Sequence, residues 1–68
     1  MSKVKEYRIA YGISMEEAAK VMGITRPTYV TRESGKTEFS KVEMEKFVNY
    51  LKEKIADKPI TIQDIFFD

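Results

Sequence analysis

The sequence contains no cysteine and no histidine. Without these residues there is no disulfide framework, no thiol nucleophile and no ordinary zinc or haem site. A small hydrolase that uses carboxylates is a poor alternative, because no two carboxylates are both close in sequence and away from an expected helix cap, and no histidine is present to act as a base. We therefore expect a protein that is not an enzyme and that needs neither a metal nor an organic cofactor.

Long apolar runs are also missing. No run approaches the ~20 residues needed to cross a bilayer, and the charged amino terminus MSKVKEYR lacks the apolar stretch of a secretory signal. We expect a cytoplasmic protein without a membrane partner. A chain of 68 residues has room for one small core, so residues 1–68 are expected to form a single domain.

Excess charge of one sign is absent as well. The net charge is only +1, which argues at first against a nucleic-acid partner, since DNA-binding domains usually meet the phosphates with surplus Lys and Arg. The distribution is uneven, however, with +3 up to Lys36 and −2 beyond it. Such a chain can present a basic face to DNA while its other end stays neutral or acidic.

Glycine and capping residues divide the chain into helices. Each glycine follows an amphipathic segment and fits a left-handed C-terminal cap, namely Gly12, Gly23 and Gly35. Three starts show the capping-box spacing, in which a hydroxyl residue precedes an acidic one by three: Ser14 with Glu17, Ser40 with Glu43 and, more weakly, Thr61 with Asp64. Thr25 can cap a further helix that has Pro27 in its first turn.

These capping residues and glycines predict helices at about 3–11, 15–22, 26–34, 41–56 and 62–66, with Pro59 separating the last two. No segment has the pattern of a strand. The predicted fold is therefore all-α, a compact five-helix bundle.

The most informative stretch is ISMEEAAKVMGITRPTYVTRESGK, residues 13 to 36, where two short helices are joined by Gly23, Ile24 and Thr25. A turn of three or four residues that contains glycine is typical of a DNA-binding helix-turn-helix. Ala19, four residues before Gly23, allows the two helices to approach closely. The motif is expected at about residues 15–34.

This pattern resembles the lambda-repressor/Cro-like (XRE-type) helix-turn-helix family over essentially the whole chain. The resemblance rests on Arg8, Gly12, Ile13, Ser14, Ala19, Gly23, Glu33, Gly35 and Lys36, and on the tail ITIQDIFF. It implies a sequence-specific regulator of transcription, a small phage-type repressor, that inserts helix 26–34 into the major groove of a double-stranded DNA operator. It also implies a structural ion pair between Arg8 and Glu33.

Two positions depart from the family pattern. Met15 stands where the family often has a glutamine that touches a phosphate, which leaves the helix amides at that end as phosphate donors. Arg32 occupies a place usually held by a partly buried apolar residue. Two interpretations stay open for Arg32: it reaches past the core edge to solvent and phosphate, or it alters how the third helix is seated.

Helical periodicity selects the side chains that would face the bases. Arg26 at the start of the helix is the first choice, since a guanidinium can bridge the two major-groove acceptors of guanine. Pro27 and Val30 present apolar surface suited to thymine methyl groups. The competing interpretation is that Arg26 is an ordinary solvated residue of the first turn.

Three further residues are assigned to the same interface. Thr31 lies on the outward face and would contact a base edge or a phosphate. Thr28 and Lys36 are expected to position the DNA backbone without reading sequence.

A single short reading helix gives limited affinity, so we expect a homodimer that binds an inverted repeat. The candidate dimer contacts are Ile62, Phe66 and Phe67, with the alternative that most apolar residues of the tail cover the core. Control would then come from protein concentration, operator affinity or a competing regulator protein. The chief rival function is a protein-interaction module, an antirepressor or antitoxin-like helix-turn-helix protein that acts mainly by binding another protein.

Overall fold

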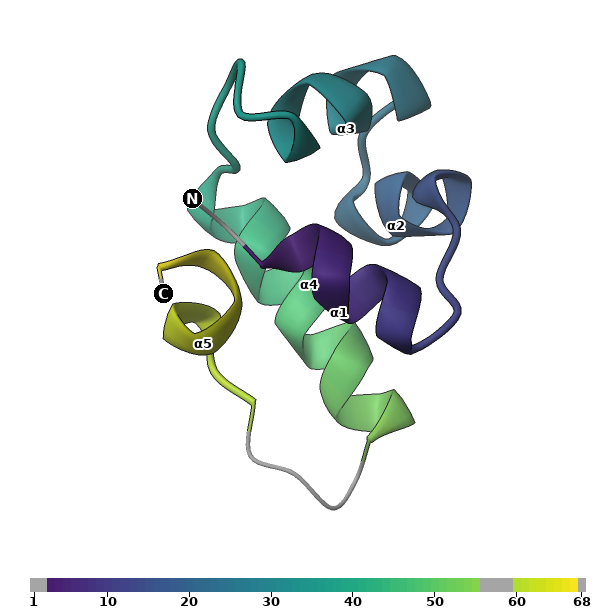
Figure 1. The fold of residues 1–68 in the computed structure, drawn as a ribbon, viewed down its shortest axis with the longest axis vertical. Coiled ribbons are helices and arrows are strands. Elements are labelled where there is room, and N and C mark those ends of the chain that lie inside the picture. The colour runs from purple at the N-terminus through teal and green to yellow at the C-terminus, as the bar shows by residue number, and fades with distance from the viewer. Residues whose placement is uncertain (1–2, 56–59, 68) are drawn as a thin grey trace.

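The structure is a computed structural model that describes residues 3–55 and 60–67 (Figure 1). It contains five helices, α1 (Val4–Ala10), α2 (Met15–Met22), α3 (Arg26–Glu33), α4 (Lys41–Lys54) and α5 (Ile62–Phe66), and no strand within those ranges. The prediction of an all-α five-helix fold is confirmed. The fourth helix, predicted at about 41–56, ends at Lys54, because Ile55 has left the helical conformation. The break at Pro59 lies outside the described residues.

Apolar side chains from all five helices meet in one core. Its buried members are Val4, Ile13, Ala18, Ala19, Met22, Tyr29, Phe39, Phe47, Val48, Leu51, Ile60, Ile65 and Phe66. The start of α1 is tied to α5 by a backbone hydrogen bond of 2.6 Å from Lys3 N to Ile65 O. Helix α3 contributes only Tyr29 to this core, so most of its surface is left for other contacts.

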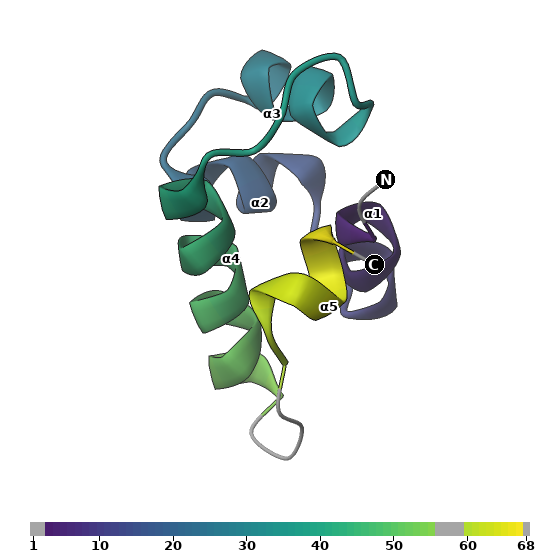
Figure 2. The same ribbon diagram turned by 90° about the vertical axis from the view of Figure 1, so that its left-hand side faces the viewer.

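The arrangement of the helices places α3 at one end of the molecule. In both views α3 lies over α2 and apart from α5 (Figures 1 and 2), and its backbone packs mainly against α2. The tight turn between them requires Gly23, whose φ of +76° lies in the left-handed region. Ile24 N donates to Ala19 O at 3.0 Å across this turn, which closes the end of α2 directly before α3 begins.

The three predicted capping boxes did not all form. Ser40 with Glu43 and Thr61 with Asp64 each show both reciprocal hydrogen bonds. Ser14 accepts from Glu17 N at 3.0 Å, but the Glu17 carboxylate instead accepts a hydrogen bond from the Tyr50 hydroxyl of α4. The prediction of a full box at Ser14 was therefore wrong, because a tertiary partner competes for the Glu17 side chain.

Candidate nucleic-acid interface

The first turn of α3 is the most open part of the motif. Arg26 and Pro27 are exposed, and Thr25 caps the helix by accepting a hydrogen bond of 3.4 Å from Thr28 N. The hydroxyls of Thr25 and Thr28 lie 2.9 Å apart. Within the described residues Arg26 forms no hydrogen bond or ion pair, so its guanidinium donors remain available for a ligand.

The next turn offers apolar surface and few free donors. Val30 is 40% exposed, so part of its apolar side chain is accessible to a partner. Thr31 is half-buried, and its hydroxyl donates to Thr28 O at 2.8 Å, while the Ser34 hydroxyl donates to Thr31 O at 2.9 Å. Thr31 therefore keeps only its acceptor lone pairs and its methyl group for an outside partner.

Lys36 follows α3 in the loop to α4. The chain turns at Gly35, whose φ is +92°, and Lys36 N donates to Thr31 O at 3.1 Å. This bond holds the exposed Lys36 against the last turn of α3. The cationic residues Arg26 and Lys36 thus lie near opposite ends of the same helix.

A buried charge cluster holds the inner side of α3. The Arg8 Nε donates to Glu33 Oε2 at 2.9 Å, and their side chains are 10% and 6% exposed. Arg8 Nη1 also donates to Ile13 O at 3.0 Å, and the Tyr29 hydroxyl donates to the same Glu33 oxygen at 2.5 Å. The structure therefore brings together the two residues for which an ion pair was expected.

Burial and charge shift the pKa values within this cluster. Burial, reinforced by the hydrogen bond to Glu33, raises the pKa of Tyr29 well above its ordinary value. Burial works against the charge of Arg8, but the hydrogen bond and the negative charge of Glu33 outweigh it and raise the pKa of Arg8. The cluster thus keeps Tyr29 protonated and Arg8 charged, which suits a structural role.

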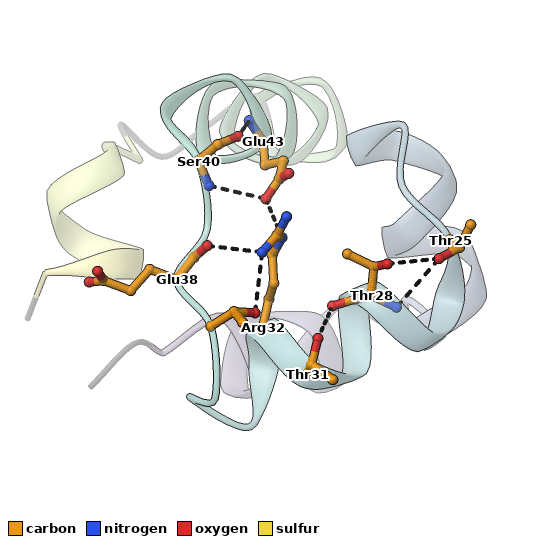
Figure 3. A network of polar contacts seen from close by, with 8 residues as sticks. Thr25, Thr28, Thr31, Arg32, Glu38, Ser40 and Glu43 are labelled. Carbon is orange, nitrogen blue, oxygen red and sulfur yellow. Dashed lines mark hydrogen bonds and ion pairs between the residues drawn. The ribbon is translucent and has the colours of Figure 1, made fainter.

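Arg32 turns away from the outward face of α3 and toward α4 (Figure 3). Its Nε lies 2.8 Å from Glu43 Oε1. This contact is an ion pair without a well-aligned hydrogen bond, because the Nε proton has no acceptor in line with it. Of the two interpretations that the sequence left open, this contact favours the one in which Arg32 affects the seating of the third helix.

Sequence reasoning identified Glu43 as a capping residue but missed its contact with Arg32. The only available signal was an arginine at a position that is usually apolar, since such a residue needs an acceptor nearby. Met15, the other departure from the family pattern, is half-buried and packs against the core.

The three candidate dimer residues of α5 and its end have different environments. Phe66 is 7% exposed, and its ring centroid lies 5.2 Å from that of Phe39 and 6.3 Å from that of Phe47. Ile62 is half-buried against the same core, whereas Phe67 is 64% exposed. Phe66 therefore fills the core of the monomer, and Phe67 is the large apolar group of this set that remains available to a partner.

The described parts of the chain contain neither a candidate metal site nor a candidate membrane-spanning helix. No group of three or more acidic side chains there is placed to hold a metal ion. Among the helices of residues 3–55 and 60–67, none has the length and hydrophobicity needed to span a bilayer.

Comparison with known proteins agrees with this geometry. The family model described as Helix-turn-helix (HTH_3) matches residues 4–58, which include α1 to α4. No curated protein and no solved structure gives a significant match. The matched region contains both helices of the motif and the ion-pair partners of α3.

Proposed function

The chain belongs to the lambda-repressor/Cro-like family of DNA-binding helix-turn-helix regulators, and from this premise we propose that it represses transcription by inserting α3 into the major groove of an operator. The observation that carries this proposal is the contrast between the two sides of α3. One side is fixed by Tyr29, Arg32 and Glu33, while the other presents Arg26 without an intramolecular partner in the described residues.

The residues on the outward face of α3 are assigned roles from their exposure and their remaining hydrogen-bonding groups. Arg26 is assigned to a guanine, because its fork of donors has no partner among the described residues and lies at the amino-terminal end of the reading helix. Pro27 and Val30 are assigned to thymine methyl groups. Thr31 presents a methyl group and acceptor lone pairs, so it suits a thymine methyl or a base amino group and is less suited to donating to a phosphate.

Two residues are assigned to the DNA backbone. Lys36 is exposed beside the last turn of α3 and suits a phosphate. The Thr28 hydroxyl lies 2.9 Å from that of Thr25 at the first turn, where the helix amides favour an anion. These contacts would fix the register of the domain on the duplex without reading its sequence.

We also propose that the repressor acts as a homodimer on an inverted repeat. The support is the exposed Phe67 after α5 and the half-buried Ile62 at its start, since one short reading helix buries too little surface for tight binding alone. Phe66 would contribute indirectly, by holding the end of α5 against the core.

The test is enrichment from a pool of random duplex DNA at about 50 mM and about 200 mM salt, because phosphate contacts make affinity fall with salt. A single-stranded pool of the same length is the matched control. Enrichment of an inverted repeat from the duplex pool alone, with weaker binding at the higher salt concentration, supports the proposal. Absence of enrichment together with weak binding at low salt contradicts it and favours the protein-interaction function.

A further inference from the structure

Arg32 links the carboxyl end of α3 to the loop that follows it and to α4 (Figure 3). Besides the ion pair with Glu43 of α4, its Nη1 donates to Thr37 Oγ1 and to Glu38 O, each at 3.2 Å. Both acceptors lie in the loop that connects α3 to α4 and that also contains Lys36. The ion pair and these two hydrogen bonds therefore engage Nε and Nη1 of the guanidinium with α4 and with the loop.

The partner of Arg32 is also held by hydrogen bonds that do not involve Arg32. Glu43 Oε1 accepts a hydrogen bond of 3.1 Å from Ser40 N, and Glu43 N donates to Ser40 Oγ at 3.2 Å. Glu43 is only 8% exposed. A carboxylate fixed in this way loses little further side-chain freedom when Arg32 binds it.

This contact matters for the orientation of α3 because the backbone of that helix packs mainly against α2. Its long side chains reach the other helices, Glu33 to Arg8 of α1 and Arg32 to Glu43 of α4. Two successive residues thus hold the last turn of α3 from two directions. A rotation of α3 about its axis would have to break at least one of these ion pairs.

We propose that Arg32 is a positioning residue for DNA recognition: through Glu43 it sets the orientation of α3 and the path of the loop with Lys36, and it does not itself contact a phosphate. The inference rests on the proposed function. Losing the ion pair would misplace several DNA contacts at once without removing any one of them.

The test compares Arg32→Met, Glu43→Gln and the double variant with the wild type. Glutamine at position 43 can still form the capping box, so Glu43→Gln removes the charge and keeps the start of α4. Lys52→Met is the matched control, because Lys52 is exposed on α4 and forms no described contact with α3. Binding to the enriched duplex is measured against salt, at a temperature where melting curves show that every variant is folded.

The wild type is measured first, and absence of salt-sensitive duplex binding by it overturns the proposed function together with this inference. If the wild type binds, we expect each single variant to bind about tenfold more weakly and the double variant no more weakly than either single one, since the two residues act as one unit. We expect the slope of affinity against salt to stay unchanged in these variants. We expect Lys52→Met to bind with the affinity of the wild type.

Two results overturn the inference alone. A slope that falls by about one unit in Arg32→Met, with Glu43→Gln binding as well as the wild type, identifies Arg32 as a direct phosphate contact. If the variants fold and bind DNA as tightly as the wild type, the ion pair contributes only to stability and does not position α3 for DNA recognition. If Arg32→Met does not fold, Glu43→Gln decides the question, because an unchanged affinity in that variant also contradicts the inference.

Discussion

Tyr29 and Arg8 share one oxygen of Glu33: the hydroxyl lies 2.5 Å and the guanidinium Nε 2.9 Å from Oε2. Both donors lie inside the bundle, and the carboxylate that accepts them is 6% exposed. A buried carboxylate with two strong donors is stable, while the same carboxylate without its cation leaves a charge in a poorly solvated place. This cluster should therefore dominate the response of the domain to substitutions at its centre.

Arg8→Met tests that expectation. The variant removes the cation beside Glu33 and the hydrogen bond to Ile13 O, and we expect the free energy of unfolding to fall by about 3 kcal/mol. Urea denaturation measures the change. Lys5→Met on the exposed face of the same helix is the matched control, with an expected change below about 0.5 kcal/mol. If the two variants lower the free energy of unfolding by the same amount, the buried charge cluster contributes little to stability.

The Tyr29 hydroxyl predicts a loss of stability at alkaline pH. Burial and the hydrogen bond to Glu33 raise the pKa of Tyr29 above its ordinary value of 10.0. Above this ordinary value the unfolded chain releases the Tyr29 proton while the folded protein keeps it, so the contribution is complete below pH 10 and is lost as pH rises further. The slope approaches about 1.4 kcal/mol per pH unit.

The comparison protein for this experiment is Tyr29→Phe, which shares every other titrating group with the wild type. Its free energy of unfolding is measured beside that of the wild type from about pH 8 to about pH 11.5. We expect the difference between the two proteins to shift in favour of Tyr29→Phe above pH 10. A difference that stays constant over the whole range would mean that Tyr29 titrates equally in the folded and unfolded states.

The cap of α3 gives a smaller and more local prediction. Thr25 Oγ1 accepts from Thr28 N, so Thr25→Ala should lower the free energy of unfolding by about 1 kcal/mol. Thr25→Ser retains the accepting hydroxyl and should stay close to the wild type. Thermal denaturation of both variants measures the difference, and equal stabilities would argue against a capping contribution from this residue.

The sequence predicted helix positions well where a capping residue and a glycine bracket the segment. The predicted 15–22 agrees with α2 because Ser14 supplies the start and Gly23 the left-handed end. Helix α1 spans Val4–Ala10, one residue shorter at each end than the predicted 3–11, and its start has no side-chain cap at Lys3. Local signals of this kind depend only on neighbours in sequence.

Contacts between distant residues were harder to predict. The Glu17 carboxylate accepts a hydrogen bond from Tyr50, 33 residues further along the chain. No local pattern indicates that this carboxylate bonds to Tyr50 and not to the backbone at the start of its own helix. Arg32 needed an acceptor, but several acidic residues follow it in sequence, and only the fold places Glu43 within 2.8 Å. The burial of Phe66 depends in the same way on the rings of Phe39 and Phe47.

The proposed dimer predicts a specific effect at the end of the chain. Phe67 is 64% exposed and contributes little to the monomer core, so Phe67→Ser should shift the protein toward monomer without a large loss of stability. Sedimentation analysis over a range of concentrations measures the shift. Ile9→Ser is the matched control, since Ile9 is 60% exposed on α1. An unchanged oligomeric state in Phe67→Ser, or an equal shift in Ile9→Ser, would remove Phe67 from the interface.

In the proposed function α3 reads bases and Arg26 makes a sequence-specific contact. The most direct measurement is enrichment from random duplex DNA by Arg26→Ala beside the wild type, with Lys5→Ala as the control for loss of an exposed cation on α1. We predict that Arg26→Ala loses the preference for guanine at one position of each half-site, at a cost of about 1–3 kcal/mol for the wild-type operator, while Lys5→Ala keeps the full operator preference. An unchanged base preference at every position in Arg26→Ala would contradict the account.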